Sequence, residues 1–190
     1  MTEQRKSAVN IASPWVWCIP LAPLSIAIAL YFGELQTPTF LLINRYTQML
    51  PDTLWAWLTF LGNGWGIFAL CFPLLLLAPR LLSAGLLASA IGGTFSQIIK
   101  PFLNFPRPAG VLALEDFYRV GEPLLTRAMP SGHTLTAFAV ASGIYFACDR
   151  DKRASLWWIF IIASFAGISR NALGAHWLTD GLAGCAIGIW

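Results

Sequence analysis

The stretch LLSAGLLASAIGGTFSQII, residues 81 to 99, contains no charged side chain and is rich in glycine, alanine and serine. A helix needs about 20 residues to cross a hydrocarbon core of about 30 Å, so an uncharged run of this length predicts a membrane-spanning helix. Small residues let the backbones of neighbouring helices approach closely. The stretch therefore predicts a helix that packs inside a bundle of membrane helices.

The composition of the whole chain also favours a membrane protein. Of its 190 residues, 57% are hydrophobic and 11% are charged, and the mean hydropathy is +0.65, which is rare in a soluble domain. We expect the segment Thr37 to Asp52, which is only partly apolar, to lie at the membrane interface. Other charge-poor runs are Trp15–Phe32, Leu54–Ala78, Gly132–Cys148, Ser155–Ile168 and the shorter Gly181–Trp190. We predict an all-α, polytopic bundle of about six transmembrane helices, with a short or truncated last helix, in a single domain over residues 1–190.

Polar and ionisable residues gather where these runs end. Because successive crossings alternate in direction, seven such residues are expected on one membrane face: Lys100, Arg107, Ser131, His133, Arg170, His176 and Asp180. The two histidines among them are the only ones in the chain. Taken alone, each lysine or arginine is at least as often a helix-end side chain that extends to the membrane interface as it is a member of a functional site. Convergence of all seven predicts a functional site, because ionisable groups are costly at membrane depth.

The chemistry that this set favours is phosphoryl transfer. Lys100, Arg107 and Arg170 suit a dianionic phosphate, and arginine adds bidentate hydrogen bonds. Ser131 and Gly132 lie where a helix is expected to begin, and the free N–H groups there attract an anion.

The two histidines can divide the chemical work, one as a nucleophile and one as a proton donor. Asp180 follows His176 by four residues, so in a helix it shares a face with that histidine and can hold one ring nitrogen.

Three segments resemble the motifs of the type 2 phosphatidic acid phosphatase superfamily. They are KPFLNFPRP (Lys100–Pro108), PSGH (Pro130–His133) and SRNALGAHWLTD (Ser169–Asp180), in the order and with the spacing of that family. The resemblance implies that His176 is the nucleophile that forms a phosphohistidine, that Asp180 orients it and that His133 protonates the leaving oxygen. It implies phosphate binding by Lys100, Arg107, Ser131, Gly132 and Arg170, with no metal and no cofactor. The short carboxyl end departs from the six-helix pattern of the family.

The leading function is therefore an integral membrane lipid phosphatase or diphosphatase. Candidate substrates are undecaprenyl diphosphate, phosphatidylglycerol phosphate and phosphatidate, with lipid A phosphatase or lipid-to-lipid phosphotransferase as alternatives. The motifs also resemble those of vanadium-dependent haloperoxidases, which are soluble, and a non-enzymatic protein that binds or transports anions is a further alternative. The loop Ala109–Met129 is long enough to be functional, either as a cover for the site or as a contact for the lipid headgroup, and a solvated connector is the alternative. No nucleic acid partner is expected, and the oligomeric state is left open.

The distribution of basic residues sets the expected orientation. With the amino terminus inside, six of the twelve basic residues fall on each side of the membrane. Setting aside Lys100, Arg107 and Arg170 as site residues leaves an inner excess, as the positive-inside rule requires. We therefore expect a multi-pass protein of the bacterial inner membrane, with the site facing the periplasm or the cell exterior.

Overall fold

The secondary structure of residues 17–190, the part of the chain that the computed structural model describes, is helical and contains no strand. The predicted all-α class is confirmed. The first two residues of the run Trp15–Phe32 lie outside this range. The α-helices are α2 (Leu21–Phe32), α3 (Gln36–Thr47), α4 (Asp52–Phe60), α5 (Gly64–Cys71), α6 (Leu74–Leu77), α7 (Pro79–Leu103), α8 (Gly132–Ala147), α9 (Trp158–Ala172) and α10 (Leu178–Ile189), with short 3₁₀ turns at Pro108–Gly110 and Arg153–Leu156.

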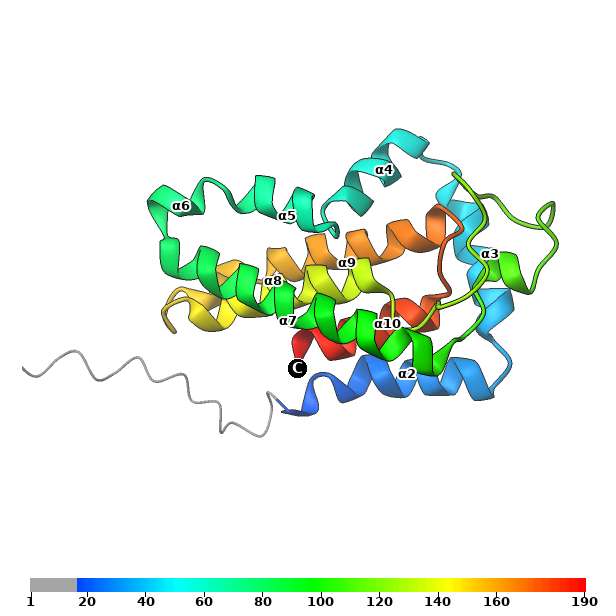
Figure 1. Cartoon of the computed structure of the whole chain (residues 1–190), viewed down its shortest axis with the longest axis horizontal. Helices are drawn as coiled ribbons and strands as arrows, with labels where there is room; N and C mark the ends of the chain where they lie inside the picture. The colour runs from blue at the N-terminus through cyan, green and yellow to red at the C-terminus, as the bar shows by residue number, and fades with distance from the viewer. Residues whose placement is uncertain (1–16) are drawn as a thin grey trace, which may run out of the picture.

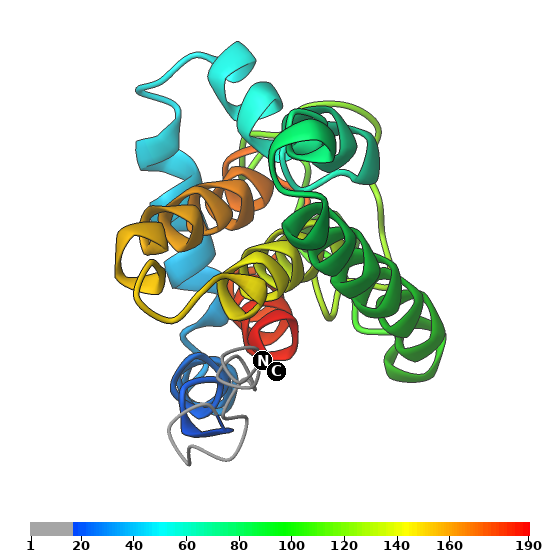
Figure 2. The ribbon, with the colours of Figure 1, turned by 90° about the vertical axis from the view of Figure 1, so that its left-hand side faces the viewer.

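Helix α8 forms the centre of the bundle (Figure 2) and packs against α7, α9 and α10. Its buried residues include three alanines, Ala137, Ala139 and Ala141, together with Thr134, Leu135, Phe138, Val140 and Ser142. A Cβ atom at Gly143 would lie 2.7 Å from the carbonyl oxygen of Ala84, so α7 and α8 are in backbone contact there. The small residues therefore have the packing role expected from the sequence.

The run Leu54–Ala78 does not form one straight helix. Helices α4 and α5 meet at an angle of 76° across residues 61–63, and α6 is a further short segment. The Asn63 side chain accepts a hydrogen bond of 3.0 Å from the Trp65 N–H and so caps the amino end of α5. Hydropathy does not reveal such a break, because the residues on both sides of it are apolar.

A second sharp bend separates α2 from α3, whose axes differ by 109°. Helix α3 covers most of the segment Thr37–Asp52 and lies at the end of the bundle that also carries the long loop after α7 (Figure 1). By length and composition, one described helix region, Pro79–Gly110, is able to cross a membrane, and up to three spans result if each bent pair is counted as one. Helix α10 is apolar but shorter.

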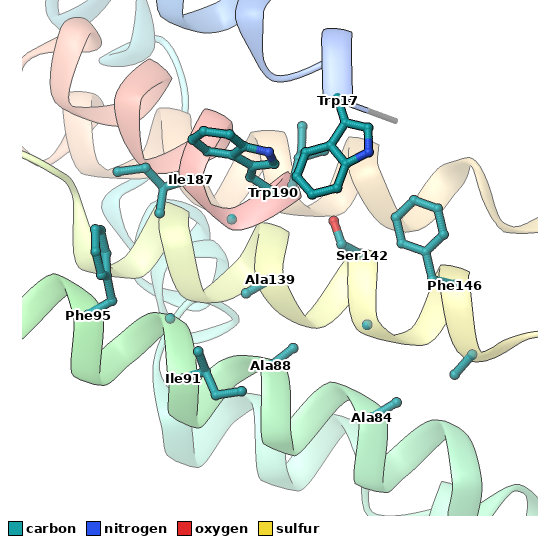
Figure 3. Close-up of a pocket in the computed structure, with 15 residues that line it drawn as sticks. Trp17, Ala84, Ala88, Ile91, Phe95, Ala139, Ser142, Phe146, Ile187 and Trp190 are labelled. Atoms are coloured by element: carbon teal, nitrogen blue, oxygen red, sulfur yellow. The ribbon is translucent and has the colours of Figure 1, made fainter. Parts of the chain in front are cut away.

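An apolar cavity of about 780 Å³ lies between α7, α8 and the last turn of α10 (Figure 3). Trp17 and Trp190 line one side of it, and their rings meet edge to face with centroids 6.2 Å apart. The Ser142 hydroxyl points into this cavity from α8. The other lining side chains include Ala84, Ala88, Ile91, Phe95, Ala139, Phe146 and Ile187.

Candidate functional site

Three segments that are far apart in sequence meet at one end of the bundle, on the right in Figure 1. They are the carboxyl end of α7, the amino end of α8 and the connector between α9 and α10. The Ser131 N–H donates a hydrogen bond of 2.9 Å to the backbone carbonyl of Asp180, which ties the start of α8 to α10. The PSGH segment is therefore anchored directly to the segment that carries His176.

His176 and Asp180 form a buried pair. His176 Nδ1 lies 3.2 Å from Asp180 Oδ2, and the two residues are 2% and 1% exposed. The same carboxylate oxygen accepts a hydrogen bond of 2.9 Å from the Trp177 N–H, at the first turn of α10. Asp180 thus fixes the amino end of its helix and the orientation of the imidazole. With Nδ1 turned to the carboxylate, Nε2 is the ring nitrogen left for another partner.

Burial and positive charge both act on the His176 imidazole. They hold its pKa well below the usual value for histidine, because burial disfavours the charged ring and because four groups add positive charge: Arg107, Arg170, Lys100 and His133. The three predicted cations and both histidines therefore lie within electrostatic reach of one another. A neutral imidazole keeps a lone pair, which a nucleophile requires.

The two arginines are held in place by neutral acceptors. Arg107 donates to the carbonyl oxygens of Thr126 at 2.9 Å and Ala175 at 3.0 Å. Arg170 donates from Nη1 to Thr59 Oγ1 at 2.9 Å, and its buried Nε has no hydrogen-bond partner among residues 17–190. No carboxylate forms a salt bridge with either guanidinium within this part of the chain. Their charge is therefore available to an anion.

Lys100 lies over the amino end of α8. Its Nζ atom is 3.7 Å from the position that a Cβ at Gly132 would take, and the residue is 9% exposed. Helix α7 ends one turn later at Leu103, and its cap residue Asn104 has the left-handed conformation, so the chain turns there toward Arg107. The first N–H groups of α8 have no acceptor in their own helix, so the lysine and the helix end favour an anion at the same place.

His133 is in contact with the break between α4 and α5. A Cβ atom at Gly62 would lie 2.9 Å from His133 Cβ and 2.8 Å from the His133 carbonyl oxygen, so only glycine fits there without displacement. The sharp bend after α4 therefore has a role at the site, because it brings Gly62 against the histidine. Gly62 and Thr59, which lie at or near this break, are not among the site residues predicted from sequence.

The loop after α7 packs against the site. Val120 N–H donates to the Leu173 carbonyl at 3.3 Å, and Arg107 N–H donates to the Leu125 carbonyl at 2.9 Å. Gly174 has φ +70°, and a Cβ there would lie 2.6 Å from the Tyr118 carbonyl oxygen. A cavity of about 90 Å³ remains between this loop and the connector, with Arg119 and Arg170 in its wall. These contacts favour a cover over a solvated connector for the loop Ala109–Met129.

Asn44 is a structural residue of the site that the sequence analysis missed. It is 2% exposed, and its Nδ2 donates to the carbonyls of Tyr118 at 2.9 Å and Asn171 at 3.0 Å, while its Oδ1 accepts from Tyr118 N–H at 2.8 Å. Asn171 in turn donates to the His176 carbonyl at 3.0 Å. Together Asn44 and Asn171 link α3, the loop Ala109–Met129 and the connector that carries His176. The available signal was a polar residue between the apolar stretches of the segment 37–52.

Acidic residues and thiols do not gather at this site. Within residues 17–190, no three His, Cys, Asp or Glu side chains lie close enough together to hold a metal ion. The polar groups that do converge are two imidazoles, one carboxylate and three cations. This set matches a phosphate better than a metal ion, because the cations repel a metal and attract an anion.

Comparison with known proteins places this arrangement in a family. The model of the PAP2 superfamily matches residues 80–190, which contain all three motifs. The chain belongs to the PAP2 superfamily. The structure of Aquifex aeolicus LpxE is 30% identical, with a TM-score of 0.68 over 82% of this chain and 90% of that chain. A transmembrane PAP2-type phosphatidylglycerolphosphate phosphatase from Bacillus subtilis is 20% identical and shares the fold, with a TM-score of 0.66 over 90% and 91% of the two chains.

A curated relative of this PAP2 protein is the lipid A 1-phosphatase of Porphyromonas gingivalis. The two sequences are 44% identical over 62 residues, which is 32% of this chain and 14% of the relative. The chain therefore matches about one seventh of that protein. The PAP2 fold and the apolar helices identify this chain as a membrane-type member of the family.

Proposed function

We propose that this PAP2 protein hydrolyses the phosphate of a membrane lipid through a phosphohistidine on His176. The observation that carries the proposal is the buried contact of 3.2 Å between His176 Nδ1 and Asp180 Oδ2. It leaves Nε2 as the nitrogen that attacks phosphorus, with the carboxylate balancing the positive charge that develops on the ring.

The reaction has two steps, and each uses groups at this end of the bundle. Nε2 of His176 forms a bond to phosphorus while the bond to the lipid oxygen breaks, and His133 supplies the proton to that oxygen. A water molecule then attacks the phosphohistidine and passes a proton to His133, which restores both residues. Lys100, Arg107, Arg170 and the start of α8 neutralise the phosphoryl oxygens throughout, since charge stabilisation is the main demand of phosphoryl transfer.

The lipid A phosphates are the substrates that the comparisons favour. The curated relative carries the name lipid A 1-phosphatase, and the stretch shared with it is 44% identical. Undecaprenyl diphosphate, phosphatidylglycerol phosphate and phosphatidate offer the same phosphoryl group on a lipid and remain candidates. We place the protein in the bacterial inner membrane with the site toward the periplasm or exterior, on the support of its basic-residue distribution.

Phosphate release from a panel of lipid phosphates tests this function. Purified protein in detergent is incubated with lipid A 1-phosphate, undecaprenyl diphosphate, phosphatidylglycerol phosphate and phosphatidate, and inorganic phosphate is measured. We expect release from at least one of them, with the highest kcat/KM for lipid A 1-phosphate. The His176→Ala variant serves as the blank. Equal, background-level release from every lipid by both proteins would reject the proposal.

The loss of catalytic activity in the His133→Ala variant should depend on the leaving group of the substrate. Because His133 protonates the leaving oxygen, we expect kcat/KM, which reports the step that forms the phosphohistidine, to fall by about 10²–10⁴ with a lipid alcohol. With a nitrophenyl phosphate, whose leaving oxygen needs no proton, the loss in kcat/KM should be smaller by about tenfold or more. Comparing kcat/KM of the wild type and the variant on both substrates measures this difference. An identical loss on both would assign His133 to binding.

A further inference from the structure

The helices of this protein contain several serines, and three of them have a hydroxyl hydrogen-bonded within its own helix. Ser83, Ser164 and Ser169 each donate to the carbonyl oxygen three or four residues earlier, at 3.0, 2.8 and 2.7 Å. This is the usual arrangement for serine within a helix. Ser96 on α7 differs, since its hydroxyl is buried and has no hydrogen-bond partner among residues 17–190.

Ser96 faces the amino end of α8. It precedes Lys100 by four residues, so both side chains lie on one face of α7. A Cβ atom at Gly132 would lie 3.5 Å from Ser96 Oγ and 3.7 Å from Lys100 Nζ. The hydroxyl and the ammonium group therefore flank the same point, directly over the first residue of a helix of 16 residues.

A buried hydroxyl without a partner is costly, because it has lost its hydrogen bonds to water and gained none in return. At this point three kinds of donor converge: the Ser96 hydroxyl, the Lys100 ammonium and the free N–H groups at the start of α8. The Ser131 hydroxyl oxygen at the same helix end accepts a hydrogen bond of 3.0 Å from Thr134 Oγ1, which holds its side chain in place. Such a set of donors is complementary to an anion with several oxygens.

We propose that Ser96 is a further phosphate-binding residue of this site. Its hydroxyl donates a hydrogen bond to a phosphoryl oxygen that also contacts Lys100 and the amino end of α8. This inference rests on the proposed function and adds to it a donor from outside the three motifs. A hydrogen bond to a charged group contributes enough for its loss to weaken anion binding by about tenfold or more.

The test measures anion binding with and without turnover. Ser96→Ala should raise the inhibition constant of vanadate by about tenfold and lower kcat/KM by a similar factor. Without anion, its thermal unfolding midpoint should equal or exceed that of the wild type, because an unsatisfied hydroxyl has been removed. The rise in midpoint caused by saturating inorganic phosphate or vanadate should shrink.

Ser142→Ala is the matched control. Ser142 is the other buried serine without a hydrogen-bond partner in the described residues, and it lines the apolar cavity of Figure 3. It follows Ser131 by eleven residues, which places it about 16 Å along α8 from the site. Removing its hydroxyl should leave vanadate inhibition, kcat/KM and the anion-induced midpoint shift unchanged.

The outcomes separate this inference from the proposed function. If Ser96→Ala shows the wild-type vanadate constant and the wild-type anion-induced midpoint shift, Ser96 does not bind the anion and the inference is overturned. If His176→Ala retains turnover, the nucleophile assignment is lost. In that case a reduced anion-induced shift in Ser96→Ala still supports the binding role, because that measurement needs no catalysis.

Discussion

Replacing His176 by alanine should abolish turnover, with a fall in kcat of at least about a thousandfold, because the variant has no atom to accept the phosphoryl group. In the unmodified protein, brief incubation with radiolabelled substrate and an alkaline quench should retain an alkali-stable, acid-labile label on the protein. The same treatment of His176→Ala should retain none. Steady-state phosphate release and label retention together measure the effect.

The control for this prediction is that the His176→Ala variant keeps the fold of the unmodified protein. Asp180 keeps its hydrogen bond from the Trp177 N–H when the imidazole is removed, so α10 should remain capped and the unfolding midpoint should change little. His176→Gln, which fills more of the same space, should be equally inactive. Substantial turnover in either variant would show that another group attacks phosphorus.

Replacing Asp180 by asparagine should lower kcat by about a thousandfold or more, since a carboxylate that orients a catalytic histidine contributes about that much elsewhere. The asparagine amide can still approach His176 Nδ1, now 3.2 Å from Asp180 Oδ2, but it does not balance the charge on the ring. Vanadate inhibition should change much less than kcat, because the cations and the start of α8 hold the anion. Parallel kcat and vanadate measurements test this separation.

Asp149→Asn supplies the matched control for Asp180→Asn. Asp149 is exposed, forms a contact of 3.4 Å with Lys152 and lies beyond the far end of α8, so the same chemical change should leave kcat unaltered. Retention of more than a tenth of the wild-type kcat by Asp180→Asn would contradict the orienting role. An equal loss of kcat and of vanadate binding would instead assign Asp180 to the structure of the anion site.

The helical content and the positions of most helices could be predicted from local sequence. The runs Leu81–Ile99 and Gly132–Cys148 correspond to α7 and α8 within a few residues, because long apolar stretches have few structural alternatives in a membrane. The broken run Leu54–Ala78 could not be predicted in this way. At its bend Gly62 packs against His133, a contact between distant segments that hydropathy does not contain.

The motif residues were also found by sequence alone, because their identity and spacing carry the chemistry. Sequence likewise indicated that they share one face, since helices that cross in alternation bring their ends together. The residues that support the motif residues could not be predicted from spacing or from alternating crossings. Thr59 and Asn44 hydrogen-bond to residues 111 and 127 positions away, and Ser96 lies beside Gly132 of another helix. Their residue types are common in any membrane helix.

The sequence by itself determined that this chain forms a membrane helix bundle with two histidines, one aspartate and three cations available for phosphate chemistry. These properties depend on composition, run length and spacing, which are local. Only the tertiary structure decided which ring nitrogen of His176 faces Asp180, how the loop after α7 covers the connector, and that Ser96 points at the start of α8. The reason is that each of these depends on packing between helices, where a shift of about 1 Å is enough to change the chemistry of a site.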